Sequence, residues 1–214
     1  MKSISNLLKK LIAYQTDKEH PEEIKGCLNF LVYLLKRYGL KVKTYSLAGF
    51  PSLVAARKFK KHYKYILNGH IDVVPGSLAS FKPKIRKNRL YGRGAADMKG
   101  PVAAMIELMR DPELKKVDMA LILTSDEEIG GFNGVKNLLE KQKYSCECAI
   151  IPDGGRNFNL VLAEKGVLHI KIEAKGKAAH GSRPWLGDNA LEKLLRIYQN
   201  LKNSFSQLTP PDYW

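Results

Sequence analysis

Residues 119–128 read MALILTSDEE, and this stretch decides the fold class that we predict. The segment from Met119 to Thr124 is apolar almost throughout, which is typical of a strand buried on both faces of a sheet. Three acidic residues follow within four positions, so the buried strand ends in a charged loop. In open α/β sheets, ligands bind at the carboxyl ends of the strands, and the charged loop therefore indicates a site there.

Segments with helical and strand-like patterns alternate on both sides of this strand. Apolar residues recur at helical spacing in two N-terminal segments, and Pro21 and Gly39 mark the start and the end of the second one. The predicted helices cover residues 4–12, 24–35, 101–110 and 134–141, and the predicted strands cover residues 41–47, 52–57, 65–68, 119–124 and 149–151. This order predicts an α/β fold with a mixed, largely parallel sheet between helices.

The pattern changes after residue 166. Residues 167–174 alternate between apolar and polar side chains and predict a half-exposed strand, whereas residues 189–201 predict a helix. One such β-α unit is too small to bury its own apolar face. We therefore expect a main domain in residues 1–166 and the beginning of a second domain in residues 167–214.

The net charge of +15 is concentrated in the N-terminal half of the chain. Residues 1–100 contain 21 Lys and Arg against 6 Asp and Glu, whereas residues 101–214 contain 15 of each kind. The densest basic stretches are residues 57–64 and 82–89, which fit either solvated hairpin turns or a nucleic-acid surface. No stacking-aromatic or groove-reading motif accompanies them, so we expect no nucleic-acid partner.

Apolar runs and cysteines indicate the compartment. No apolar run reaches the ~20 residues that a membrane span needs, and the N-terminus lacks the apolar core of a signal peptide. The three cysteines, Cys27, Cys146 and Cys148, are an odd number with one C-x-C pair, which is neither a disulfide framework nor a zinc knuckle. We expect reduced cysteines, no membrane contact and a cytoplasmic protein.

Carboxylates or a histidine follow the predicted strand ends in four segments. These segments are NGHID at residues 68–72, RGAADM at 93–98, SDEE at 125–128 and IPDGG at 151–155. Because the strand ends share one crevice, we expect these groups to meet in space. Carboxylates in one cleft repel each other unless a cation lies among them, and an imidazole with several carboxylates is a ligand set for zinc or another divalent metal.

Each of these groups also has an ordinary structural interpretation. His70 alone fits a hydrogen-bonded loop histidine, and the pair Glu127 and Glu128 fits a solvated turn. Asp97 fits the N-cap of the following helix, and Asp153 fits a turn residue before two glycines. Their joint occurrence at four strand ends favours the metal site.

Four strings, in this order along the chain, also carry a resemblance to a known family. They are GHIDVVPG at residues 69–76, YGRGAADMKG at 91–100, TSDEEIGG at 124–131 and HGSRP at 180–184. With them, nearly the whole chain resembles the dinuclear-zinc peptidase family of acetylornithine deacetylase, succinyl-diaminopimelate desuccinylase, aminoacylase and glutamate carboxypeptidase. The resemblance implies a hydrolase that cleaves the amide bond of an N-acyl amino acid or a small peptide.

The resemblance implies two zinc ions, for which cobalt or manganese are alternatives, and a set of metal ligands. His70 and Asp153 would bind one ion, Asp97 would bridge both ions, and Glu128 would bind the second. The resemblance also implies a cis peptide bond between Asp97 and Met98.

Further residues receive roles from the same resemblance. Glu127 would be the general base that takes a proton from the attacking water and later delivers it to the leaving amine, and Asp72 would orient the histidine ligand. His180 would stabilise the tetrahedral intermediate from the partner subunit of a homodimer. Arg183 and Asn189 would hold the carboxylate of the substrate.

The resemblance finally implies how the chain is divided. Residues 1–166 would be a catalytic zinc-binding domain, and residues 167–214 would be the first β-α unit of a ferredoxin-like lid domain. In the family, the chain then returns to the catalytic domain and supplies one more histidine to the second zinc, but no histidine follows His180 here. We expect the N-terminal part of a longer enzyme. The alternative is an inactive remnant or binding domain of the same fold, which holds metal or an anionic partner without turnover.

Overall fold

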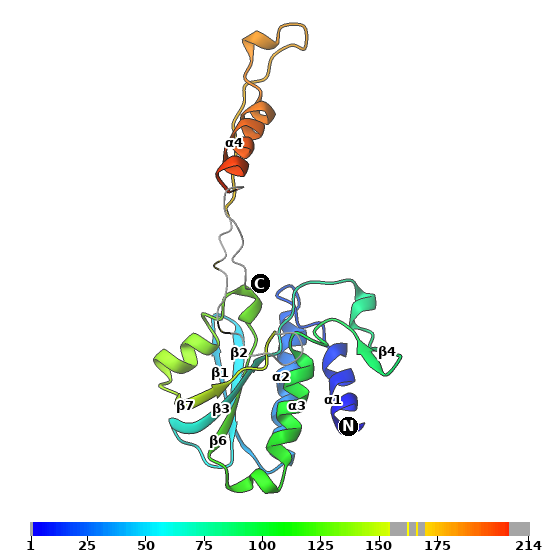
Figure 1. Cartoon of the computed structure of the whole chain (residues 1–214), viewed down its shortest axis with the longest axis vertical. Coiled ribbons are helices and arrows are strands. Elements are labelled where there is room, and N and C mark those ends of the chain that lie inside the picture. The colour runs from blue at the N-terminus through cyan, green and yellow to red at the C-terminus, as the bar shows by residue number, and fades with distance from the viewer. Residues whose placement is uncertain (1, 155–161, 163–165, 167–169, 206–214) are drawn as a thin grey trace. The chain divides into compact units, whose positions relative to one another are not determined.

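The structure is a computed structural model, and it describes residues 2–154, 162, 166 and 170–205. The chain divides into two compact units, residues 1–160 and 161–214, whose positions relative to each other are not determined (Figure 1). The predicted boundary after residue 166 adjoins residues outside the described ranges. The assignment of residues 1–166 to a catalytic domain and of residues 167–214 to a lid therefore stays a prediction.

The first unit is built around a five-stranded mixed sheet with the strand order β1-β2-β6-β3-β7 (Figure 1). The strands are β1 (Lys41–Leu47), β2 (Phe50–Ala56), β3 (His62–His70), β6 (Met119–Thr124) and β7 (Ser145–Ile150). β3 pairs parallel with β6 and β7, whereas β2 runs antiparallel to β1 and β6. All strands except β2 therefore point the same way, and the predicted mixed, largely parallel α/β sheet is confirmed.

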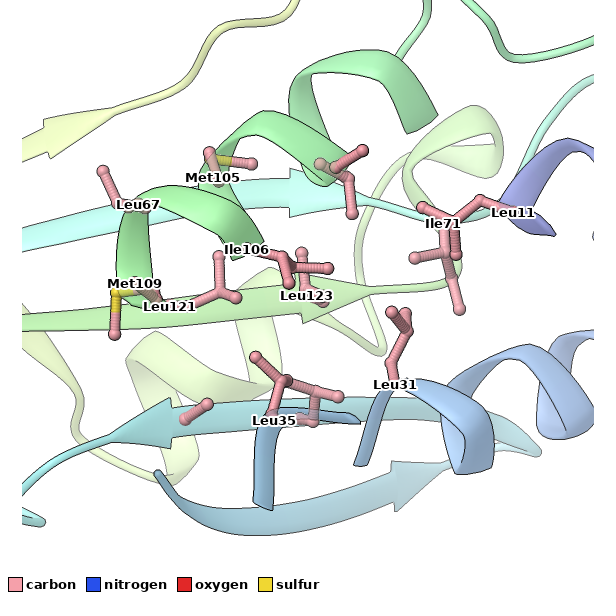
Figure 2. Packing of buried hydrophobic residues seen from close by; sticks show 14 of the residues in the cluster. Leu11, Leu31, Leu35, Leu67, Ile71, Met105, Ile106, Met109, Leu121 and Leu123 are labelled. Atoms are coloured by element: carbon pink, nitrogen blue, oxygen red, sulfur yellow. The ribbon is translucent and has the colours of Figure 1, made fainter. Parts of the chain in front are cut away.

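The helices α2 (Pro21–Arg37) and α3 (Lys99–Arg110) cover one face of this sheet, and α1 (Lys2–Ala13) packs against α3 (Figure 1). All three helices were predicted from the sequence pattern. Figure 2 shows Leu121 and Leu123 of β6 with Ile106 of α3 and Leu35 of α2 in one buried cluster. Each of these side chains removes apolar area from water, which stabilises the fold by about 1.5–3 kcal/mol per side chain.

The alternate residues of the same strand belong to a second buried cluster. Ala120 and Ile122 of β6 pack there with Leu138 and Tyr144. This division follows from the period of two along a strand, and it confirms that β6 is buried on both faces.

The segment that supplies Leu138 differs in detail from the predicted helix at residues 134–141. Residues 135–141 are helical, but from Asn137 to Lys141 the turns widen to a π-helix. The backbone N–H of Gln142 donates to the carbonyl oxygen of Asn137 at 3.0 Å, which is an i→i+5 bond.

One of the two basic stretches forms a β-hairpin. β4 (Lys84–Arg86) and β5 (Arg89–Tyr91) pair antiparallel around the two-residue turn at Lys87 and Asn88. Both turn residues have positive φ, 46° and 59°, as the type I′ hairpin turn requires. The structural interpretation of residues 82–89 as a hairpin is therefore confirmed.

The other basic stretch, residues 57–64, leads from β2 into β3. Arg57 Nη2 donates to the carbonyl oxygen of Met109 at 2.8 Å, and the Lys60 ammonium lies 2.9 Å from the Asp118 carboxylate. Several of its charges therefore have structural partners within the first unit.

The second unit contains the predicted C-terminal helix, α4 (Ala190–Phe205). Before it, Lys177 and Asp188 pair in an isolated antiparallel bridge that closes the loop carrying residues 180–184. Among the described residues, no helix has the length and apolar character needed to cross a membrane. The three cysteines are free, as expected.

The predicted strand at residues 167–174 is not found in the part that the structure describes. Residues 170–174 form no strand, and residues 167–169 lie outside the described ranges. A strand needs a neighbouring strand to pair its backbone N–H and C=O groups, and the described residues of this unit contain no such neighbour. The alternating pattern of residues 167–174 indicates which side chains would face a core, but it does not show which strand would pair with this segment.

Replacing Ile106 by alanine should lower the free energy of unfolding by about 2–5 kcal/mol, because this side chain is fully buried between α3 and the sheet. The matched control is Leu108→Ala in the same helix, where the side chain is 41% exposed and the expected loss is about 1 kcal/mol or less. Chemical denaturation followed by circular dichroism measures both losses. Equal losses would contradict the packing of this helix face on the sheet.

Candidate metal centre

His70 is the last residue of β3 and is buried. Its Nδ1 lies 3.0 Å from the carbonyl oxygen of Asp72 and 3.4 Å from Oδ1 of the same residue. Because a carbonyl oxygen only accepts hydrogen bonds, Nδ1 carries a proton and donates it. In the neutral ring, the lone pair is then on Nε2, where it is available to a metal ion.

Carboxylates surround Nε2 of His70. Asp97 Oδ1 lies 3.1 Å from it, Asp153 Oδ2 lies 3.5 Å from it, and Glu127 Oε2 lies 3.7 Å from it. One ligand atom each from His70, Asp97 and Glu128 lies within 4.8 Å of the others, and the same holds for His70, Glu127 and Asp153. The structure therefore brings together the imidazole and the four carboxylates that the sequence analysis singled out.

The order of the strands explains this convergence. β6, β3 and β7 are parallel neighbours, and His70 is in register with Thr124 at the end of β6. The two glutamates follow β6, Asp153 follows β7, and Asp97 comes from the turn before α3. Three strand ends and one helix start thus meet at the same edge of the sheet.

Asp72 connects two of these strand ends. Its backbone carbonyl accepts the proton of His70 Nδ1, and its Oδ2 accepts the backbone N–H of Glu128 at 2.9 Å. The residue is almost completely buried. It therefore holds the ring of the histidine and the beginning of the glutamate turn in a fixed relation.

Asp126 also fixes the glutamate turn, and the sequence analysis gave it no role. It is 1% exposed, and its Oδ2 accepts the backbone N–H groups of Asn133 at 2.7 Å and of Gly134 at 3.1 Å. A Cβ at Gly134 would lie 2.3 Å from Asp126 Oδ1, so the loop closes on this carboxylate only with glycine there. The string SDEE indicates that an acidic residue of this loop has a role, but the sequence pattern does not show which of the three consecutive acids is buried.

The peptide bond between Asp97 and Met98 is cis, as the resemblance implied. The alternative interpretation of Asp97 as the N-cap of α3 is wrong. Met98 occupies the cap position and no side chain caps the helix there, because the Asp97 carboxylate is directed to His70 instead.

The crowding of acidic groups changes their pKa values. Burial raises the pKa of Glu127, Glu128 and Asp153, and neighbouring carboxylates raise it further while the His70 ring lowers it. Burial lowers the pKa of His70, but the hydrogen bond to Asp72 and the surrounding carboxylates outweigh this effect and raise it to about 9. A single imidazolium does not balance these charges, whereas a divalent cation would.

Three predicted residues lie in the second unit, so their positions relative to the metal centre stay a prediction. His180 and Arg183 are exposed, and His180 Nδ1 accepts the backbone N–H of Ser182 at 3.2 Å. Asn189 has a local role: its Oδ1 accepts the backbone N–H of Leu191 at 3.0 Å and so caps α4.

Sequence comparison places the chain among peptidases. Residues 66–201 match Peptidase family M20/M25/M40. A probable succinyl-diaminopimelate desuccinylase of Staphylococcus aureus (strain Mu50) is 31% identical over 96% of this chain, and a succinyl-diaminopimelate desuccinylase of Wolbachia pipientis subsp. Culex pipiens is 29% identical over 92% of it. The matches cover 53% of each of these proteins, so the chain spans about half the length of the curated relatives it matches.

Solved structures show the same fold. A tripeptidase from Staphylococcus aureus superposes with a TM-score of 0.63 at 19% identity, over 92% of this chain and 56% of its own. Human carnosine dipeptidase 1 superposes with a TM-score of 0.61 at 22% identity, over 72% of this chain and 38% of its own. Since the family match covers well over half of the residues, this chain belongs to Peptidase family M20/M25/M40.

Proposed function

We propose that the protein containing this chain is a metal-dependent hydrolase that cleaves the amide bond of an N-acyl amino acid or a small peptide. The observation that carries the proposal is the cluster around His70 Nε2, with three carboxylates at 3.1–3.7 Å. The names of the relatives, desuccinylases and peptidases that act on amide bonds, support the same reaction class.

The donor set fits zinc, and cobalt or manganese would accept the same ligands. We assign His70 and Asp153 to one ion, Asp97 to the bridge and Glu128 to a second ion. Bound ions would polarise the scissile carbonyl and make hydroxide available at neutral pH. The short distances from His70 Nε2 to Asp97 and Asp153 support this pairing.

Glu127 is the proton acceptor in this proposal. Its side chain is 52% exposed, so its carboxylate reaches water as well as the cluster. Burial and the carboxylates of Asp153, Asp72 and Asp97 raise its pKa, which makes it a better base than a free carboxylate. It would take the proton from the attacking water and deliver it to the leaving nitrogen, while Asp72 keeps the His70 ring oriented.

A non-catalytic binding domain of the same fold is the alternative. Binding alone requires no proton acceptor beside the ligands. Glu127 lies 3.7 Å from His70 Nε2 in addition to the proposed ligands, and this favours turnover.

Three residues of the second unit have roles in this proposal. We infer that His180, acting from the partner subunit of a homodimer, stabilises the negative charge that develops on the carbonyl oxygen, and that Arg183 and Asn189 hold the substrate carboxylate. α4 exposes apolar side chains such as Leu191 and Leu195, which leave a face for a second copy in the predicted homodimer or for further residues of a longer chain. The cytoplasmic location stays a prediction.

Changing Glu127 to glutamine in the full-length protein should reduce amide hydrolysis by about 10²–10⁴-fold and leave the zinc content unchanged, because a proton acceptor is not a ligand. Activity assays and elemental analysis measure the two effects, and the exposed Glu140→Gln is the matched control. If zinc is lost together with activity, Glu127 is a ligand and the roles of the two glutamates must be exchanged.

This chain should bind one zinc ion distinctly more tightly than a second. Among the residues that the structure describes, we assign His70, Asp97 and Asp153 to the first ion, and Glu128 and the shared Asp97 to the second. In calorimetric titrations, Glu128→Gln should remove the weaker event and Asp153→Asn should weaken the stronger one. Two equally tight events would show that the ligand assignment is incomplete.

Zinc binding should become tighter as the pH rises toward about 9. Without metal, the His70 ring keeps its second proton below its pKa of about 9, and a cation at Nε2 must displace it. Displacement of one proton gives roughly a tenfold gain in affinity per pH unit below that pKa, and the gain ends above it. Calorimetry at pH 7 in buffers of different ionisation enthalpy should detect about one released proton. Binding that releases no proton would contradict the role of His70.

A further inference from the structure

Lys99 is a fully buried lysine to which the proposed function gives no role. It is the first residue of α3 and follows the proposed bridging ligand Asp97 by two positions. Among the described residues it is the only lysine or arginine that is buried. Burial of an ammonium group is costly unless the group has partners, so the contacts of Lys99 indicate what it does.

The ammonium group lies at the C-terminal end of α1. Lys99 Nζ donates to the carbonyl oxygen of Tyr14 at 2.8 Å, and Tyr14 directly follows the last residue of α1. The carbonyl groups at the end of a helix lack partners within the helix, and the helix dipole favours a cation beside them. Lys99 thus joins the start of α3 to the end of α1.

The backbone and the stem of the same residue support the turn that carries Asp97. The backbone N–H of Lys99 donates to the carbonyl oxygen of Gly94 at 2.8 Å, which closes this turn. A Cβ at Gly94, whose φ is +76°, would lie 3.0 Å from Lys99 Cδ and 3.3 Å from Lys99 Cγ. The methylene groups of the lysine therefore lie directly against the beginning of the turn.

The segment that contains the acceptor carbonyl is attached to the loop around Asp72. Thr16, two residues after Tyr14, is buried, and its hydroxyl donates to the carbonyl oxygen of Ile71 at 2.5 Å. Its own carbonyl oxygen accepts the N–H of Val73 at 3.1 Å. Because Ile71 and Val73 flank Asp72, these two bonds fix the backbone on both sides of it.

Lys99 therefore connects two parts of the proposed metal centre. Its backbone and stem hold the turn of Asp97, and its ammonium group holds residues 14–16, which are bonded to the loop of Asp72. The backbone carbonyl of Asp72 accepts the proton of His70 Nδ1, so this loop sets the orientation of the imidazole. The distance of 3.1 Å between Asp97 Oδ1 and His70 Nε2 depends on how these two parts are held together.

The charges near the ammonium group fit this placement. Burial lowers the pKa of Lys99 to about 8, whereas Cys27, Asp72 and Asp17 raise it. Asp17 and Asp72 are themselves buried. The charge of Lys99 therefore offsets part of the charge of two buried carboxylates, which lowers the cost of burying all three groups.

We propose that Lys99 is a positioning residue of the metal centre, which sets the spacing between the Asp97 carboxylate and the His70 ring through its contacts with both adjoining segments. The inference rests on the metal centre of the proposed function and adds a residue that is not one of its ligands. There are two competing explanations. Either Lys99 only stabilises the first unit, or it acts on the metal only through its charge.

Lys99→Met in the full-length protein tests the proposal, because methionine keeps an unbranched stem but has neither the charge nor the hydrogen-bond donor. Zinc affinity, measured by competition with a chelator, should fall about 10–100-fold. The absorption spectrum of the cobalt-loaded protein should also shift, since it reports the geometry of the ligands around the ion. Ile106→Ala is the matched control and should leave both unchanged, because Ile106 is a fully buried residue of the same helix that belongs to the apolar core.

The direction of the change separates the three explanations. A nearby cation repels a metal ion, so removal of a lysine that acted only through its charge would give tighter zinc binding. A purely stabilising lysine would behave like Ile106: the free energy of unfolding of the metal-free protein would fall, while zinc affinity and cobalt spectrum would stay as in the wild type. Either of these results would overturn the proposal.

Thr16→Val tests the same connection from its other end, also where Lys99→Met does not fold. Valine has the shape of threonine without the hydroxyl that bonds to Ile71, and zinc affinity should fall about 2–10-fold with a shifted cobalt spectrum. In the double variant the two losses of affinity should not add, because both substitutions break one connection. Additive losses, or an effect of Thr16→Val on the free energy of unfolding alone, would contradict the positioning role.

The results for the metal centre and for hydrolysis are distinguishable. Wild-type protein that binds neither zinc nor cobalt would reject the proposed function and the positioning role together. Metal binding that depends on Lys99 in a protein that hydrolyses no amide would retain the positioning role and reject the hydrolase. An active enzyme whose zinc affinity and cobalt spectrum do not respond to Lys99→Met would retain the function and reject the positioning role.

Discussion

The parallel pairing of β3 with both β6 and β7 is the constraint on which the site depends. It ends three strands at one edge, where His70 lies within reach of carboxylates that follow the two neighbouring strands. β2 has the opposite direction, so its first residue lies at this same edge. The β1–β2 hairpin therefore contributes Phe50 to the wall of a cavity of about 230 Å³ that Asp72 and Glu128 also line. One sheet topology places both the candidate metal ligands and this cavity.

This arrangement has an electrostatic cost that a cation would offset. Burial and mutual repulsion raise the pKa of Glu127, Glu128 and Asp153, so the cluster is unfavourable when all its acids are charged. The apolar packing of α2 and α3 on the sheet includes Ile71, between His70 and Asp72, and so supports the end of β3 (Figure 2). A metal ion that binds only the folded chain would add its binding free energy to the stability of the fold. Folding and metal binding are thus linked through the same few residues.

The sequence was most informative where one local pattern determines the structure. The strands at residues 41–47 and 119–124 were predicted with the bounds that they have. The second is a continuous apolar run, and a sheet that buries both of its faces is the simplest way to remove it from water. The five residues of the cluster were found because acidic side chains at strand ends are unusual and their strings match a family. Which of these residues are ligands and which is the base is a chemical assignment, and the distances within the cluster are consistent with it.

Two features that the sequence did not predict depend on contacts with other segments. Residues 170–174 alternate like a strand, but pairing requires a neighbour that the pattern does not name. Asp126 is one of three adjacent acids, and only the loop that closes on it at Gly134 shows that it turns inward.

Exposure differs sharply within the cluster, and this difference bears on what the first unit can do alone. The His70 side chain is 2% exposed, whereas those of Glu127 and Asp97 are 52% and 64% exposed. A buried imidazole has a fixed orientation, which suits the proposed role of His70 as a metal ligand. An exposed carboxylate exchanges protons with water, which suits the proposed role of Glu127 as a base. Electrostatic stabilisation of a developing charge is weak in water, however, and becomes strong only where water is excluded. The carboxylates of Glu127 and Asp97 are in solvent, and the proposed hydrolysis would therefore need a cover over them. The roles proposed for His180 and Arg183 would supply such a cover, so they belong to the same catalytic hypothesis as the metal ligands.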